Sequence, residues 1–380
     1  MRRAPEKSSR GFSLMELLIA LSIGMVVIAA AVQLFSKGVT ASWTVTQRAQ
    51  MQQDARAAQD MLTKDISMAG SGIQGGVALA SGTGTNPRYG CDQASCYVSG
   101  ATPAGIAFPN NYLYPIIPGA GMGPTLNAAA GATDILTVTY ADTSFLLNCY
   151  TVTFNNPPNI TSVNFTLPNP LPPNCTPPQV PQNPQPVTSA SVGLQVGDLV
   201  LFTGSVGGNT LQAVAEVTNT AGGASPYTVT FADPDRLGLN QMAATAGTLK
   251  QMNGGVNVQA FRIWVITYYI WVAPDPSGAG GPGTPRLMRQ VNGLPPVPVA
   301  DNISNLRLSY DTFDDNGNLL TRSRDAGLTQ VPPVSPNSIR KVTIENLTFR
   351  SPLPGVQGYQ SLDLHTSVSA RNMSFKDRYN

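Results

Sequence analysis

The hydrophobic positions of the chain begin with one long run near the N-terminus. Residues 12–35 are mainly apolar and contain a single charged side chain, Glu16. A helix of this length extends about 36 Å, which is enough to cross the hydrocarbon core of a bilayer, about 30 Å thick. The pattern therefore predicts a transmembrane helix over residues 12–35.

A second pattern, typical of an amphipathic helix, follows this run. Over residues 51–66 the apolar side chains recur at spacings of three or four residues, which places them on one face of a helix. These side chains are Met51, Ala55, Ala58, Leu62 and Ile66. Gly70 and Gly72 mark the expected stop. We predict one continuous helix of about fifty residues, whose second half, residues 36–70, packs on a sheet.

Beyond residue 70 the pattern changes to short alternating segments, which predict β-strands. Residues 73–130 show only weak periodicity, and the proline run at 168–186 predicts an extended loop, because proline cannot donate to a strand ladder. The strongest strand signal is Phe261–Val272, which is rich in β-branched and aromatic residues. The other expected strands lie at 134–140, 150–154, 163–167, 198–203, 213–218, 227–231, 286–291, 303–310, 339–349 and 361–371.

Together these patterns predict an α+β fold. A long N-terminal helix, transmembrane in its first half and amphipathic in its second, is expected to carry a C-terminal antiparallel β-sheet domain, like the stick of a lollipop. The expected segments are a leader at 1–11, the membrane helix at 12–35, its amphipathic half at 36–70, an irregular and β-rich region at 71–255, and a C-terminal β-sheet region at 256–380.

Composition and charge narrow the class of protein. Apolar residues make up 42% of the chain, which argues against global disorder. Charged residues make up only 12%, and Gly, Pro, Ser, Thr and Asn replace them, a mixture that suits an exported, β-rich domain. The formal net charge is +2, and no Lys/Arg cluster occurs after residue 10. Nucleic acid is therefore not supported as a partner, because phosphate binding needs clustered cations.

The four cysteines form two neighbouring pairs in the sequence. Four cysteines allow three connectivities, and in an exported chain we favour Cys91–Cys96 and Cys149–Cys175 as disulfides. A zinc site is a poor alternative, because the cysteines lack C-x2-C spacing and the only histidine, His365, is distant in sequence.

The leader that precedes the apolar run is short and basic. By the positive-inside rule it stays in the cytoplasm and the rest of the chain is exported. One alternative is an ordinary secretory signal peptide, for which Ala29-Ala30-Ala31 offers a cleavage site. The length of the run and its carboxylate argue against this alternative, because a charge in an apolar helix costs about 2.5–3.5 kcal/mol at mid-bilayer. An uncleaved plain anchor is a further alternative.

Residues 10–17, Arg-Gly-Phe-Ser-Leu-Met-Glu-Leu, resemble the class III signal sequence of type IV prepilins and pseudopilins. The resemblance implies that a prepilin peptidase cuts between Gly11 and Phe12 and methylates the new amino group of Phe12. It also implies an assembly role for Glu16. A lone carboxylate in an apolar environment is penalised, and pairing with the α-ammonium of a neighbouring subunit's Phe12 relieves that penalty.

A second resemblance rests on the order of several weaker motifs. Residues 62–72, 285–293, 299–311, 339–350 and 365–375 occur in an order similar to that of PilW-type minor pilins. This implies a minor pilin that primes or caps assembly of a type IV pilus at or near its tip, with roles in adhesion and twitching motility. The implied partners are other major and minor pilins, the prepilin peptidase, the pilus assembly platform and a tip adhesin.

The resemblance also implies a location. The chain would cross the bacterial inner membrane once, with its C-terminal domain in the periplasm, before assembly into a surface pilus. Two other functions remain open. The first is a J-class pseudopilin of type II secretion. The second is a membrane-anchored binding module or adhesin that does not polymerise, for which Glu16 would be dispensable.

The sequence offers little chemistry for an enzyme, and we expect no catalytic residue, metal or cofactor. His365 lies in an alternating strand and is interpreted as a sheet position. The acidic stretch 311–318 fails the EF-hand pattern and is interpreted as an Asn-Gly hairpin turn. Asp233-Pro234-Asp235 is interpreted as another turn. The remaining candidates are the aromatic residues Trp264, Tyr268, Tyr269 and Trp271, which we interpret as core or sheet packing, because alternate strand residues face opposite sides.

Overall fold

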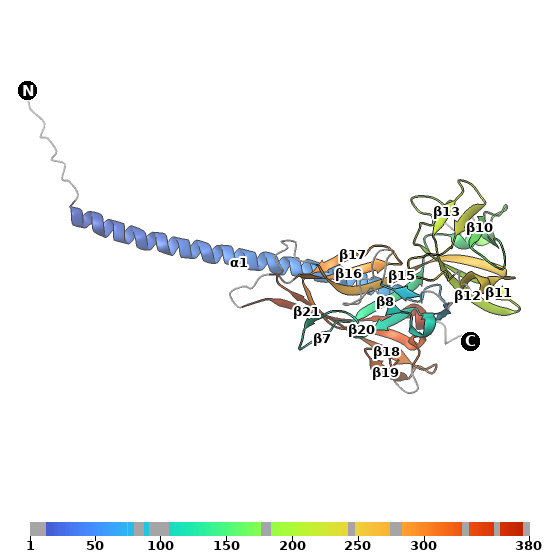
Figure 1. The fold of residues 1–380 in the computed structure, drawn as a ribbon. Helices are drawn as coiled ribbons and strands as arrows, with labels where there is room; N and C mark the ends of the chain where they lie inside the picture. Colours follow the sequence, from blue (N-terminus) through green and yellow to red (C-terminus); the bar gives the residue numbers. More distant parts are fainter. Residues whose placement is uncertain are drawn as a thin grey trace, which may run out of the picture. The chain divides into compact units, whose positions relative to one another are not determined.

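The computed structural model describes residues 13–73, 75–79, 87–90, 106–175, 184–241, 248–273, 283–328, 334–352 and 358–374. The chain forms two compact units. The first consists of residues 1–52 and 351–360, and the second of residues 53–350 and 361–380. Figure 1 shows the elements of both units.

Helix α1 (Leu14–Met68) runs without interruption over 55 residues, as the two hydrophobic patterns predict. Its predicted apolar face is buried from Met51 to Ile66. Burial begins at Met51 and not at residue 36, and the large apolar side chains between these positions, Val39, Trp43 and Val45, are exposed. The helix ends before Gly70, whose φ of +79° favours glycine. Gly72 also has a positive φ, and a Cβ there would lie 2.6 Å from Cβ of Ala141.

The largest sheet is built around β15 and is antiparallel throughout. The first half of β15 pairs with β11, where Leu201 lies opposite Phe261. The second half pairs along both edges, so that Tyr268 lies opposite Leu136 of β8 and opposite Arg289 of β16. The strands are β5 (Ile116–Gly119), β8 (Ile135–Ala141), β11 (Leu199–Val206), β12 (Asn209–Glu216), β15 (Val256–Ala273), β16 (Thr284–Val291) and β17 (Val297–Asp301).

A second antiparallel sheet has the strand order β19-β18-β20-β21. The alternation along these strands places side chains such as Leu306, Leu308 and Ile344 in the core, where they are fully buried. The strands are β18 (Ile303–Phe313), β19 (Leu319–Ser323), β20 (Ile339–Arg350) and β21 (Ser361–Ser369). Helix α2 (Arg371–Ser374) follows the last strand, so Arg371, which was predicted to end that strand, instead begins a helical turn.

A third, smaller antiparallel sheet has the strand order β13-β14-β10-β9. One of its faces, with Val163, Phe165 and Val229, belongs to the same buried cluster as Val200 and Phe202 of β11. Figure 1 shows β10 and β13 beside β11 and β12. The strands are β9 (Thr151–Phe154), β10 (Ser162–Thr166), β13 (Asn219–Ala221) and β14 (Tyr227–Thr230).

The remaining elements are short. Three two-stranded ladders join β1 (Val77–Ala78) to β4 (Tyr112–Leu113), β2 (Arg88–Tyr89) to β3 (Ile106–Ala107), and β6 (Thr125–Asn127) to β7 (Gly131–Ala132). The 3-10 turns are η1 (Pro109–Asn111), η2 (Leu147–Cys149), η3 (Pro173–Cys175), η4 (Thr248–Met252) and η5 (Pro336–Ser338). Turn η3 lies within the proline run that was predicted as a wholly extended loop.

The structure thus has the predicted α+β fold, in which a long, apolar N-terminal helix precedes a domain rich in antiparallel sheets. Every strand predicted from alternation overlaps an observed strand. The predicted boundary between residues 255 and 256 was drawn between an irregular, β-rich region and a C-terminal β-sheet region. Hydrogen bonds cross this boundary, because β8 and β11 precede it and both pair with β15.

Candidate functional site

The start of α1 is organised by two reciprocal hydrogen bonds between Ser13 and Glu16. The backbone N–H of Glu16 donates to Oγ of Ser13 at 3.2 Å, and the backbone N–H of Ser13 donates to Oε2 of Glu16 at 3.0 Å. This is a capping box, which satisfies two donors that the first helical turn leaves unpaired. The Glu16 carboxylate is therefore held at the N-terminal end of the helix. Gly11 and Phe12, the predicted cleavage and methylation residues, lie outside the described residues.

The first part of α1 presents a continuous apolar surface. All of its large apolar side chains from Leu14 to Phe35 are exposed, and an 18-residue stretch of the helix has a mean hydropathy of 2.5 with none of it buried inside the chain. By length and composition α1 can cross a membrane. Exposed apolar area of this extent is unfavourable in water, so this segment requires lipid or other helices around it.

The second part of α1 is fixed to the sheet by a buried carboxylate, Asp65. Its side chain is 3% exposed. It accepts hydrogen bonds from the hydroxyl of Tyr140 at 3.0 Å, from the hydroxyl of Tyr268 at 2.6 Å, and from Nε of Arg289 at 2.8 Å. These partners come from β8, β15 and β16, which lie side by side in the large sheet. One helical residue therefore connects α1 to three strands.

Two of the partners of Asp65, Tyr268 and Arg289, keep the protonation states in which they donate hydrogen bonds to it. Burial, and then the charge of Asp65, raises the pKa of Tyr268 above its ordinary value, so the hydroxyl remains a donor. Burial by itself would lower the pKa of Arg289, but the hydrogen bond and charge of Asp65 outweigh burial and raise it. The guanidinium therefore stays charged across the physiological range, with its Nε 2.8 Å from Oδ2 of Asp65.

A buried cation, Arg262, lies in the half of β15 that pairs with β11. Its guanidinium lies 4.7 Å from the ring centre of Phe145 and 4.8 Å from that of Trp264. It also forms ion pairs with Asp142 at 2.5 Å and with Asp198 at 3.7 Å. The two aromatic rings and the two carboxylates compensate the energetic cost of burying the Arg262 charge. Asp142 precedes β9 and Asp198 follows β10 in the sequence, so Arg262 connects β15 to both of these segments.

One of the predicted disulfides lies within the described residues. Cys149 and Cys175 are bonded, with their Cα atoms 5.8 Å apart, and both are buried. The two cysteines are 26 residues apart in the sequence, and the loop that their bond closes contains β9 and β10. Loop closure of this length contributes about 3 kcal/mol to stability through chain entropy. Cys91 and Cys96, the other predicted pair, lie outside the described residues.

The remaining residues singled out from the sequence occupy structural positions. His365 is exposed on β21, with Nε2 3.5 Å from Oε2 of Glu345. The acidic stretch forms the predicted turn between β18 and β19, where Gly317 has a φ of +83° and its N–H donates to the carbonyl of Asp314. Among the described residues, no group of three or more His, Cys, Asp or Glu side chains is placed to hold a metal ion.

The turn at Asp233-Pro234-Asp235 is also an irregular bend, as predicted. Oδ2 of Asp235 accepts a hydrogen bond from the backbone N–H of Leu239 at 2.5 Å, which shapes the chain after the bend. Of the aromatic candidates on β15, Tyr268 and Tyr269 are fully buried, while Trp264 and Trp271 are half-buried.

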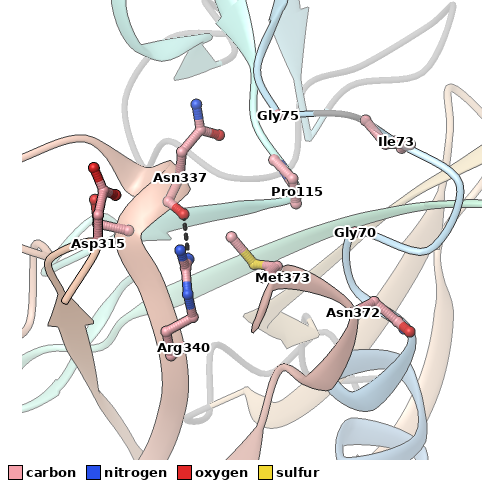
Figure 2. Close-up of a pocket in the computed structure, with 10 residues that line it drawn as sticks. Gly70, Ile73, Gly75, Pro115, Asp315, Asn337, Arg340, Asn372 and Met373 are labelled. Atoms are coloured by element: carbon pink, nitrogen blue, oxygen red, sulfur yellow. Dashed lines mark hydrogen bonds between the residues drawn. The ribbon is translucent and has the colours of Figure 1, made fainter. Parts of the chain in front are cut away.

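Figure 2 shows a surface pocket of about 250 Å³ beside the C-terminal end of α1. Its lining includes Arg340, whose Nη1 donates to the carbonyl of Asn337 at 2.5 Å. It also includes Asn372, whose Nδ2 donates to the carbonyls of Ser67 at 3.1 Å and Met68 at 3.4 Å. These carbonyls belong to the last turn of α1 and lack helical partners. The pocket therefore borders a C-terminal cap made by α2.

Sequence reasoning missed the most connected polar residues. Asp65 and Arg289 were not singled out, although Asp65 lies three residues after Leu62 and thus on the apolar face of the amphipathic pattern. A charge on such a face is a usable signal, because a buried charge needs a partner. The capping role of Ser13 also had a signal, since Ser followed three residues later by Glu is the capping-box spacing.

Comparison with protein families gives one match. Residues 7–32 match the prokaryotic N-terminal methylation motif. This span contains Ser13, Glu16 and the start of the apolar surface of α1, and it supports a type IV pilin or pseudopilin-like protein anchored in the inner membrane by its N-terminal helix. Searches of curated proteins and of solved structures give no match.

Proposed function

We propose that this chain is a minor pilin of a type IV pilus that primes or caps the filament at or near its tip. Prepilin peptidase cuts after Gly11 and methylates the amino group of Phe12. The single observation that carries the proposal is the methylation motif at residues 7–32, directly at the start of an exposed apolar helix. The finer assignment to the PilW type rests on the order of sequence motifs alone.

The geometry at the helix start is compatible with assembly. Oε2 of Glu16 accepts from the N–H of Ser13, which is the residue next to Phe12. After cleavage, the carboxylate therefore lies at the N-terminal end of the helix, where it can pair with the α-ammonium of Phe12 of a neighbouring subunit in the filament. In a low-dielectric environment this ion pair offsets the energetic cost of removing the Glu16 carboxylate and the α-ammonium from water. The exposed apolar side chains of α1 then bury against neighbouring helices, which removes them from lipid and water.

The processing step is tested by the mass of the mature protein. The full chain is expressed with and without a prepilin peptidase, and its N-terminus is determined by intact mass and fragmentation. We expect a chain that starts at N-methylated Phe12 only when the peptidase is present. Gly11→Leu serves as the matched control, because a side chain at this position obstructs close approach to the protease; this variant is expected to keep Met1.

Two outcomes would contradict the proposal. A mature chain that starts near Val32 would indicate an ordinary secretory signal, and an unprocessed Met1 in the presence of active peptidase would indicate a plain anchor. Either result would leave a secreted or anchored β-rich binding protein.

A pseudopilin of type II secretion is the second candidate, because the methylation motif supports pilins and pseudopilins alike. Removal of the protein separates the two. Loss of surface pili with normal protein secretion supports the minor pilin, whereas loss of secretion with normal pili supports the pseudopilin.

A further inference from the structure

The part of the chain that contains the small sheet has almost no charge. From Thr143 to Ala232 the only charged residues are Asp198 and Glu216, although charged residues make up 12% of the whole chain. Both of these are buried, at 4% and 1% exposure. The surface that the described residues of this segment offer to solvent is therefore formally neutral. Soluble domains normally carry surface charge, which keeps them apart in solution.

The outer face of the small sheet is correspondingly neutral and polar. The apolar side chains of its strands point into the buried cluster with β11, so the alternate positions form the opposite face. We call this the neutral face, and define it by Thr151, Thr153, Ser162, Asn164, Thr228 and Thr230. On the last strand, β13, the face continues with Asn219 and Ala221. Threonine and asparagine thus recur across four strands.

Hydrogen bonds between side chains hold the centre of the neutral face in place. Nδ2 of Asn155 donates to Oγ of Ser162 at 3.1 Å and to Oδ1 of Asn164 at 3.0 Å. Nδ2 of Asn164 donates back to Oδ1 of Asn155 at 3.1 Å, and Oγ1 of Thr228 donates to the Asn164 oxygen at 2.9 Å. Thr151 and Thr153 are exposed at the edge of this network. Because the network fixes its rotamers, a ligand that binds it loses less conformational entropy.

The chemistry of the face selects the class of partner. Nucleic acids and anionic lipids need cations, and the six defining residues include none. Protein interfaces are centred on aromatic or Arg anchors, which these residues also lack. Hydroxyl and amide groups both donate and accept hydrogen bonds, as do the hydroxyl groups of sugars. Strands about 4.8 Å apart repeat these groups in a regular array, which suits a polymer with repeating hydroxyl groups.

We propose that the neutral face binds a neutral polysaccharide. This binding goes beyond the assembly role proposed above and does not depend on it, because the face lies on β9, β10, β13 and β14, whereas processing and assembly concern residues 11–16. A chain that fails to be cleaved after Gly11 can still bind the polysaccharide, and a cleaved chain can fail to bind it. The two proposals therefore fail separately.

The test uses the full chain in a non-ionic detergent that has no sugar headgroup. The purified protein is incubated with microcrystalline cellulose, chitin, starch, mannan and dextran, and the bound fraction is measured after washing. We expect retention on at least one of these polymers. Retention should be the same at about 0.05 and about 0.5 M NaCl, because screening by salt affects only charged contacts.

The variant Thr151→Lys/Thr153→Lys places two hydrated charges on the exposed edge of the face and should weaken binding at least about tenfold. Thr151→Ser/Thr153→Ser keeps the hydroxyl groups and should bind like the parent chain, which separates the loss of chemistry from a loss of fold. Ser361→Lys/Ser367→Lys makes the same change at exposed positions of β21, away from the face, and should leave binding unchanged.

Three results would overturn the proposal. The first is no retention on any of the five polymers. The second is equal retention of the Thr151→Lys/Thr153→Lys variant and the parent chain. The third is self-association of the parent chain that these lysines abolish without any polymer binding, which would make the neutral face a contact between copies of the protein.

Discussion

Glu216 is a carboxyl group that folding removes almost completely from water. It is 1% exposed, and Oε2 accepts a hydrogen bond from the backbone N–H of Leu237 at 2.9 Å. Burial, and then the negative charge of Asp235, raises the pKa of Glu216 to about 7. Burial likewise raises the pKa of Asp235, and the charge of Asp233 adds to the effect. At this residue the folded state therefore holds a proton that the unfolded chain releases.

This arrangement makes stability depend on pH in a defined direction. Between the ordinary pKa of 4.5 and about 7 the folded state binds more protons than the unfolded state, so stability is greatest below this window and falls as the pH rises through it. The loss is about 3 kcal/mol across the window. Glu216→Gln keeps an acceptor for Leu237 without a titrating group and should reduce the slope in urea unfolding curves measured from pH 5 to pH 8, while Asp235 still contributes to it below about pH 6.

Asp363→Asn is the control, because Asp363 is an exposed carboxylate on β21 and its replacement by an amide should leave the slope unchanged. If Glu216→Gln and the parent chain lost stability equally with rising pH, the burial of Glu216 would not be the cause.

Asp65 shows what residue-level sequence reasoning can reach. The helical pattern places it near the buried face of α1, and that much is local information. Its partners Tyr140, Tyr268 and Arg289 lie 75, 203 and 224 residues further along the chain. The order of the strands in the sheet decides which cation and which hydroxyl groups bind Asp65. No single segment of the sequence encodes that order.

At the scale of elements, α1 depends on this same carboxylate for its attachment to the large sheet. Asp65→Asn removes the counter-charge of Arg289 while the shape of the side chain remains nearly the same. Breaking a buried pair at one partner costs about 3 kcal/mol or more, so the free energy of unfolding should fall by that amount in urea titrations of the full chain.

Asp60→Asn provides the control for this prediction. It makes the same chemical change on the same helix at an exposed position, where the expected change is within about 0.5 kcal/mol. Equal destabilisation by the two variants would show that helix propensity, rather than attachment to β8, β15 and β16, accounts for the effect.

The predictability of the other elements follows from their length and surroundings. Long strands such as β15 and β20 carry strong β-branched or alternating patterns and were found from the sequence. Strands β1 to β4 have only two residues each, too few to show a period. Strand β17 contains Pro298, which lowers its strand signal, and it lies at the edge of the sheet, where proline is tolerated.

At the scale of the whole molecule, the proposed function requires that Glu16 act between subunits as well as within its own helix. Its capping box with Ser13 gives it a local role worth about 1 kcal/mol. The assembly role predicts a much larger effect, because an α-ammonium without its carboxylate in low dielectric is strongly penalised.

The two roles separate when Ser13→Ala and Glu16→Ala are compared in a strain that produces pili. Both variants disrupt the capping box, but only Glu16→Ala removes the carboxylate. We expect Ser13→Ala to enter sheared pilus fractions at near the parent level, and Glu16→Ala to be correctly processed yet absent from them. The mature N-terminus of each variant is verified by mass, so that a defect in cleavage is not mistaken for one in assembly. Equal incorporation of both variants would reduce Glu16 to a helix cap, and the chain would then fit an anchored module that does not polymerise.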